Sequence, residues 1–115
     1  MGSSDLRLST SILCVAEFVV GAEAREEKLL RDWIDAGDLE VIGLDEVEDA
    51  YRAARFRKKQ GLTLPDAFIL ASVFRLRAHF LTNDGNLLKK AKPLVEATDP
   101  IGSAAEEKIA WAFLK

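Results

Sequence analysis

Three acidic residues stand where an α/β fold could bring their carboxylates together. Glu17 lies near the start of one apolar helical segment, Asp66 lies near the start of another, and Asp84 ends the stretch HFLTND. In open parallel sheets, ligands bind outside the carboxyl ends of the strands, so acids at these positions converge on one edge. Carboxylates gathered there repel one another unless protons or cations compensate. Since Mg²⁺ and Mn²⁺ prefer oxygen ligands, the pattern predicts a divalent metal site.

Each acid also has a purely structural explanation. Glu17 follows Cys14 by three residues and could belong to a variant capping box, Cys-x-x-Glu, in the first helical turn. Asp66 would be stabilised by the positive end of its own helix. Asp84 precedes Gly85, a context in which aspartate often only builds a turn. An unrelated α/β domain, whose acids are no more than helix caps, therefore stays an alternative.

The hydrophobic pattern alternates between strand-like and helix-like segments, which predicts an α/β fold with a mostly parallel sheet flanked by helices. Pro65 favours the first turn of a largely buried helix, because its missing N–H has no helical partner there. Strands are expected at 6–14, 39–44, 79–84 and 94–98. Helices are expected at 15–37 with a break near Gly21, at 46–61, from Pro65 onward, at 85–92, and at 103–115 with Ser103 as the cap.

Length and composition restrict the class of protein. The 115 residues suffice for one domain, and residues 1–5 are either a tag or a truncated start. No apolar run is long enough to cross a membrane, and no targeting segment is evident, so we expect a cytoplasmic protein. Cys14 and His79 are the sole cysteine and histidine, which excludes a Cys/His zinc site. The net charge of −3 implies that a nucleic acid would be bound through local basic groups or bridging cations.

Three segments together resemble a known family. SILCVAEFVVGA (11–22), GLTLPDAFILAS (61–72) and FLTNDGNL (80–87) are similar, in order and spacing, to the later motifs of PIN-domain ribonucleases, most closely the VapC-type toxins of toxin–antitoxin pairs. The resemblance implies a single three-layer PIN-like domain over residues 6–115. Each motif alone has little specificity, and the combination carries the resemblance.

The resemblance also implies a function. Glu17, Asp66 and Asp84 would be catalytic ligands of Mg²⁺ or Mn²⁺, and Thr82, Asn83 and Cys14 would support them. The metal would activate a water that hydrolyses RNA phosphodiesters. The implied partners are an RNA substrate, an antitoxin protein and further copies of the chain, with no membrane.

One family motif is missing from the sequence. The family begins with a strand that ends in aspartate followed by Ser or Thr, and only MGSSD precedes the first predicted strand. That strand is central in the family's sheet, so a four-stranded sheet is expected here. Either the flanking strands pair directly or another chain supplies the missing one. Because an acid is lost with the strand, the alternative function is a truncated, catalytically inactive PIN scaffold that serves as a binding or assembly module.

Overall fold

A mixed sheet organises the fold of this computed structural model, which describes residues 8–44, 46–99 and 112–114. The strands are β1 (Leu8–Ser11), β2 (Glu40–Ile42), β3 (His79–Leu81), β4 (Ala97–Thr98) and β5 (Ala112–Leu114). Their order in the sheet is β2-β1-β5-β3-β4. β1 pairs with β2 and β3 with β4, both in parallel, as the alternating pattern predicts. The predicted α/β class is confirmed.

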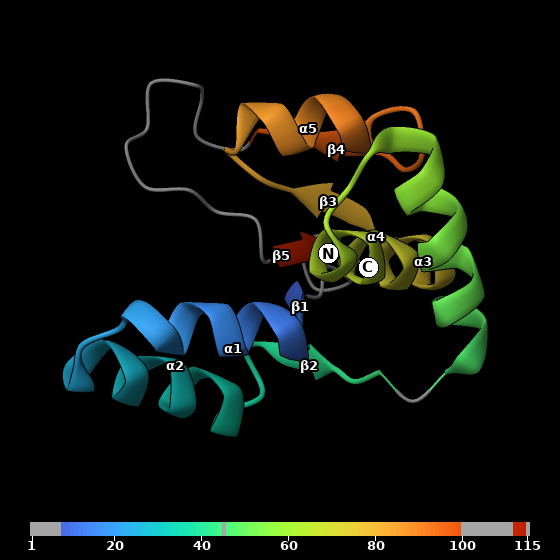
Figure 1. The fold of residues 1–115 in the computed structure, drawn as a ribbon. Coiled ribbons are helices and arrows are strands. Elements are labelled where there is room, and N and C mark those ends of the chain that lie inside the picture. The colour runs from blue at the N-terminus through green and yellow to red at the C-terminus, as the bar shows by residue number, and fades with distance from the viewer. Residues whose placement is uncertain (1–7, 45, 100–111, 115) are drawn as a thin grey trace, which may run out of the picture.

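The central strand β5 was not predicted. It runs antiparallel to β1 on one side and to β3 on the other, so the sheet of the described residues has five strands instead of the expected four (Figure 1). The prediction of a tail helix is wrong for residues 112–114, and its remainder, including Ser103, lies outside the described residues. Both expectations for the missing strand are also wrong, because β1 and β3 neither pair directly nor need another chain: the same chain fills the gap.

Five helices accompany the strands in the described residues: α1 (Ile12–Gly21), α2 (Ala24–Asp35), α3 (Val47–Gln60), α4 (Leu64–Leu76) and α5 (Gly85–Ala91). Figure 1 shows α1 beside α2 below the sheet, α5 near β4, and α3 crossing α4. Gly61 ends α3 with a φ of 65°, a left-handed conformation that glycine adopts without strain. The N-cap of α3 is Glu46.

Helix α1 begins earlier than the sequence indicates. Its N-cap is Ser11, whose hydroxyl accepts a hydrogen bond from the backbone N–H of Leu13 at 3.1 Å. Cys14 is therefore inside the helix, and the expected capping box of Cys14 and Glu17 does not form. Glu17 falls in the second turn, where the field of the helix terminus is weaker.

Helix α4 is the most buried helix and presents Asp66 at its first turn. Ala67, Ile69, Leu70, Ala71 and Val73 are at most 1% exposed and belong to the main core cluster. A buried ion pair joins α4 to α3, because Nε of Arg75 lies 3.1 and 3.0 Å from the two carboxylate oxygens of Asp49. Within the described part of the chain, no helix has the length and apolar character needed to cross a membrane.

Candidate functional site

Asp66 and Asp84 come from different elements and lie near each other. Asp66 is half-buried in the first turn of α4, where its backbone N–H donates to the hydroxyl of the N-cap Thr63 at 3.3 Å. Asp84 is not the end of a strand, because β3 stops at Leu81. It is the N-cap of α5, and its carboxylate accepts hydrogen bonds from the backbone N–H groups of Asn86 and Leu87.

The two carboxylates interact electrostatically. The pKa of Asp66 is raised, chiefly because burial disfavours its charged form, and the negative charge of Asp84 raises it further. Two groups oppose the rise, namely the hydrogen bond with Thr63 and the positive charge of Lys90. A carboxylate that is destabilised by desolvation and by a neighbouring acid is suited to bind a cation.

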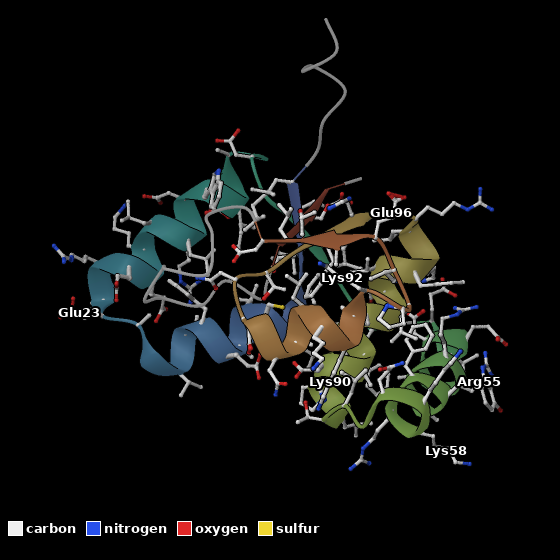
Figure 2. All side chains as sticks on the ribbon, turned by 90° about the horizontal axis from the view of Figure 1, so that it is seen from above. Glu23, Arg55, Lys58, Lys90, Lys92 and Glu96 are labelled. Atoms are coloured by element: carbon white, nitrogen blue, oxygen red, sulfur yellow. The ribbon has the colours of Figure 1, made fainter. Side chains whose placement is uncertain are left out.

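Lys90 is a part of this site that sequence reasoning missed. Its Nζ donates to the backbone carbonyl of Gly61 at 3.2 Å, which fixes the ammonium group beside the turn between α3 and α4. Figure 2 shows Lys90 extending from α5 toward that turn, with Lys58 on the neighbouring α3. The helical spacing of α5 does not reveal this contact, because Gly61 comes 29 residues earlier in the chain.

Cys14 lies near both Asp66 and Glu17. Cys14 is 2% exposed, and burial raises the pKa of its thiol to about 12, while hydrogen bonds with Thr10 and Ser11 lower it. The charges of Glu17 and Asp66 both raise it further, which places the thiol within the electrostatic range of both acids. Glu17 itself is exposed. In residues 8–44, 46–99 and 112–114, no group of three or more His, Cys, Asp or Glu side chains is positioned to hold a metal ion.

Thr82 and Asn83 connect β3 to the acid pair. Both are buried, and the hydroxyl of Thr82 accepts a hydrogen bond from the backbone N–H of Asp84 at 3.1 Å. This bond fixes the backbone on which the Asp84 carboxylate stands. The structure thus brings together Asp66, Asp84 and Thr82, with Cys14 adjacent, and leaves Glu17 at the periphery.

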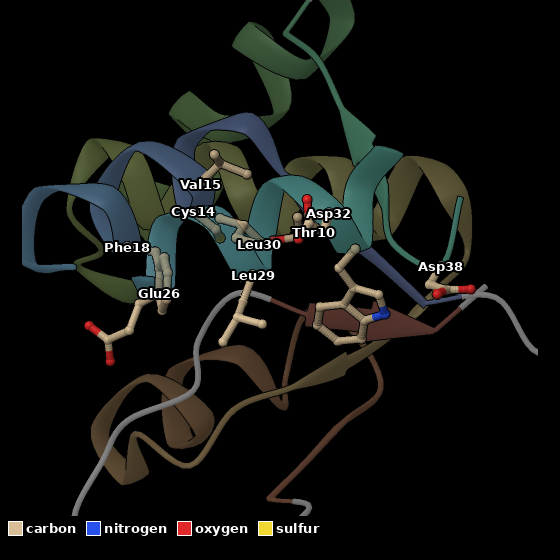
Figure 3. Close-up of a pocket in the computed structure, with 10 residues that line it drawn as sticks. Thr10, Cys14, Val15, Phe18, Glu26, Leu29, Leu30, Asp32 and Asp38 are labelled. Carbon is tan, nitrogen blue, oxygen red and sulfur yellow. The ribbon is translucent and has the colours of Figure 1, made fainter. Parts of the chain in front are cut away.

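A cavity of about 560 Å³ opens between α1 and α2 (Figure 3). Its wall is mainly apolar. Cys14 lines this cavity and also lies within the electrostatic range of Asp66. The helical spacing in α2 predicts an apolar face, but not that this face stays partly open, with Leu29 67% exposed. The lining residues are Thr10, Cys14, Val15, Phe18, Glu26, Leu29, Leu30, Asp32, Trp33 and Asp38.

Comparison with known proteins identifies the family. The family model of the PIN domain matches residues 3–93, which is well over half of the chain and includes Glu17, Asp66 and Asp84. Strands β4 and β5 lie beyond the matched range. No curated protein and no solved structure shows a significant match. Membership of this family supports nuclease activity in general. From the family match and the α/β fold together, we conclude that the chain belongs to the PIN domain family.

Proposed function

We propose that the protein is a Mg²⁺- or Mn²⁺-dependent endoribonuclease that hydrolyses RNA phosphodiesters. The observation that carries the proposal is the juxtaposition of Asp66 and Asp84, two carboxylates from helices far apart in sequence. A purely structural role would explain why each acid stands at the start of its helix. It would not explain why the fold places the two negative charges close enough to repel each other.

The donor set of this pair fits a hard divalent ion. Mg²⁺ is commonly held by one or two carboxylates, with waters and substrate phosphates completing its coordination. Asp66 and Asp84 would supply these carboxylates. A bound ion would supply an activated water and would neutralise charge on the phosphodiester. The positive charge of Lys90 opposes the effect of Asp84 on the pKa of Asp66.

The surrounding residues would position the pair. The hydroxyl of Thr82 holds the backbone of Asp84, and Thr63 holds that of Asp66. Lys90 would attract the phosphate backbone of RNA to the acids, since an ammonium group is a phosphate-binding point charge. Glu17 would join as a third ligand by a rearrangement of its exposed side chain, and Asn83 and the Cys14 thiol would shape the site.

The biological setting that we propose is that of a toxin in a toxin–antitoxin pair, acting in the cytoplasm and held in check by an antitoxin protein. The support is the similarity of residues 11–22, 61–72 and 80–87 to the motifs of VapC-type toxins. We further propose that the chain forms homo-oligomers. Co-expression of the chain with its neighbouring open reading frame tests the pairing, with relief of growth arrest as the expected result.

RNA cleavage tests the enzymatic proposal. A labelled single-stranded RNA is incubated with the chain and with Asp66→Asn, in Mg²⁺, in Mn²⁺ and in a chelator. Asp35→Asn, at the exposed end of α2, is the matched control. We expect cleavage by the wild type and Asp35→Asn in metal only. Wild-type cleavage no greater than the Asp66→Asn background would reject the enzymatic function.

A second candidate function is a catalytically inactive PIN scaffold that serves as a binding or assembly module. Two observations favour it. The central strand β5, Ala-Phe-Leu, carries no acid, and the described residues contain no group of three metal-binding side chains. A scaffold of this kind would bind Mn²⁺ weakly and leave RNA intact, so the same cleavage assay distinguishes the two functions.

A further inference from the structure

One side of α3 combines basic groups with exposed aromatic rings. Tyr51 is 60% exposed, and Phe74 of the neighbouring α4 is 47% exposed, although phenylalanine is among the residues most often buried. Residues three, four and seven apart lie on one side of a helix, so Tyr51, Arg55 and Lys58 are neighbours there. Arg55 and Lys58 project outward from α3 in Figure 2. We call this surface the α3 face; it comprises Tyr51, Arg52, Arg55, Lys58, Lys59 and Phe74.

Arg52 and Phe74 form a cation–π stack on this face. Cζ of Arg52 lies 4.7 Å from the ring centroid of Phe74, and Phe56 contacts the same ring edge-on, with the two centroids 5.9 Å apart. The stack orients the planar guanidinium, whose N–H groups match the geometry of phosphate oxygens. Among the ion pairs of the described residues, none involves a cation of the α3 face. These charges are therefore available to a ligand.

The needs of the helix account for only part of the α3 face. The last turn of α3 is basic, which stabilises the negative end of the helix dipole. Arg52 and Arg55 come before that turn, and the exposed ring of Tyr51 gains nothing from the dipole. A ligand that carries both negative charges and flat rings would use the cations and the rings together. Single-stranded RNA has these two properties in its phosphates and its bases.

The α3 face leads toward the acid pair. The ion pair of Asp49 with Arg75 joins the start of α3 to the end of α4, so the two helices run in opposite directions. The first turn of α4, which carries Asp66, is therefore beside the basic end of α3. Phe74 lies eight residues further along α4, roughly 12 Å of helix. Lys90 contacts the turn at the Asp66 end, which extends the basic surface to the carboxylates.

We propose that the α3 face is a docking surface for single-stranded RNA. A base stacks on the ring of Tyr51, and the phosphates follow Arg52, Arg55 and Lys58 toward the acid pair. The inference rests on the proposed function, because it gives the RNA substrate a binding surface next to the carboxylates. The chain has a net charge of −3, so RNA needs a locally basic surface of this kind. Stacking and phosphate contacts tolerate any base, so binding through this face has little sequence preference.

RNA binding in a chelator tests the surface separately from cleavage. The fluorescence anisotropy of a short labelled single-stranded RNA is measured with the full chain over a range of salt concentrations. The first variant is Arg55→Gln with Lys58→Gln. Its matched control is Arg25→Gln with Lys28→Gln, which changes the net charge equally at side chains of α2 that are 83% and 74% exposed. The second variant, Tyr51→Leu, removes the ring and leaves the charge unchanged.

The salt dependence distinguishes the two kinds of contact. The Arg55 and Lys58 variant should lower the slope of log affinity against log salt by about 1.4, at about 0.7 for each lost phosphate contact, and the α2 control should keep the wild-type slope. Tyr51→Leu should weaken binding about fivefold or more with its slope unchanged.

Equal slopes of the Arg55 and Lys58 variant and its control would overturn the proposal, as would unchanged affinity of Tyr51→Leu or no RNA binding by the wild type. If the α3 face instead serves a protein partner, all variants bind RNA as the wild type does, which also overturns it. Cleavage in Mn²⁺ keeps this inference apart from the enzymatic one. A wild type that binds RNA through this face without cutting it would reject the ribonuclease function and still support the docking surface.

Discussion

Removal of Arg75 should destabilise the fold strongly, because it would leave the carboxylate of Asp49 buried without its partner. Asp49 is 1% exposed, and both of its oxygens lie within 3.1 Å of Nε of Arg75. Breaking a buried pair in this way typically costs about 3–5 kcal/mol. The Arg75 side chain is 27% exposed, so water can partly enter its place, and we expect Arg75→Met to cost about 3 kcal/mol. For a domain of this size, that corresponds to a fall in Tm of roughly 12 °C.

The reverse substitution separates burial of charge from loss of a contact. Asp49→Asn leaves a partly exposed guanidinium and an amide oxygen that still accepts from Nε, so its cost should be about 1 kcal/mol. The control is Lys28→Met, which breaks the shorter but exposed pair with Asp32, 2.8 Å, and should leave stability unchanged within error. Urea unfolding followed by circular dichroism measures all three. Equal effects of Arg75→Met and Lys28→Met would refute the reasoning.

Three further predictions concern the neighbourhood of the acid pair. Burial and the charge of Asp84 raise the pKa of Asp66, so the folded state holds the carboxyl proton of Asp66 more tightly than the unfolded chain does. This tighter binding of the proton stabilises the fold fully at low pH, and the stabilisation is lost as the pH rises through the raised pKa. In a chelator, Asp66→Asn should therefore have a Tm at pH 7 that is at least as high as that of the wild type, with the gain vanishing toward pH 3; a lower Tm at pH 7 would contradict this. Thr82→Val keeps the shape but removes the acceptor for the backbone N–H of Asp84, and it should cost about 1–2 kcal/mol in urea unfolding. Gly61→Ala forces a side chain into a backbone with a φ of 65°, and it should cost about 1 kcal/mol, whereas an unchanged midpoint would show that this helix end is not under that constraint.

Much of the fold follows from local patterns in the sequence. The β-prone segments near residues 8–11, 40–42, 79–81 and 97–98 became strands. Pro65 lies in the first turn of α4 as its missing N–H requires, and the left-handed Gly61 ends α3. The predicted ends of the helices were less accurate. Ser11, and not Cys14, is the N-cap of α1, because a hydroxyl is a better acceptor for backbone N–H groups than a thiol.

The central strand could not be predicted locally. Residues 103–115 have a helical pattern, yet Ala112–Leu114 form a strand because the inner edges of β1 and β3 need a partner. Tertiary demand overrides local propensity there. Similarly, the position of Arg75 near the negative end of α4 accounts for a basic residue, but its pairing with Asp49 depends on how α3 crosses α4.

For the candidate site, sequence patterns indicated which acids matter but not how they are grouped. Asp84 follows β3 as the N-cap of α5, and Asp66, in the first turn of α4, lies within its electrostatic range, a proximity that depends on how the helices pack. Glu17 is exposed in the second turn of α1, because this helix starts at Ile12 and not after Cys14. The contact of Lys90 with Gly61 joins residues on different elements, and no spacing rule reveals it.

Direct titration with Mn²⁺ tests the central claim, namely that Asp66 and Asp84 share a divalent ion. Free Mn²⁺ is monitored by electron paramagnetic resonance during titration of the wild type, Asp66→Asn, Asp84→Asn and the control Asp35→Asn. We predict one site in the wild type and in Asp35→Asn, and a loss of affinity of about tenfold or more in each of the other two variants. Equal Mn²⁺ affinity of all four proteins, or none in the wild type, would contradict the shared site.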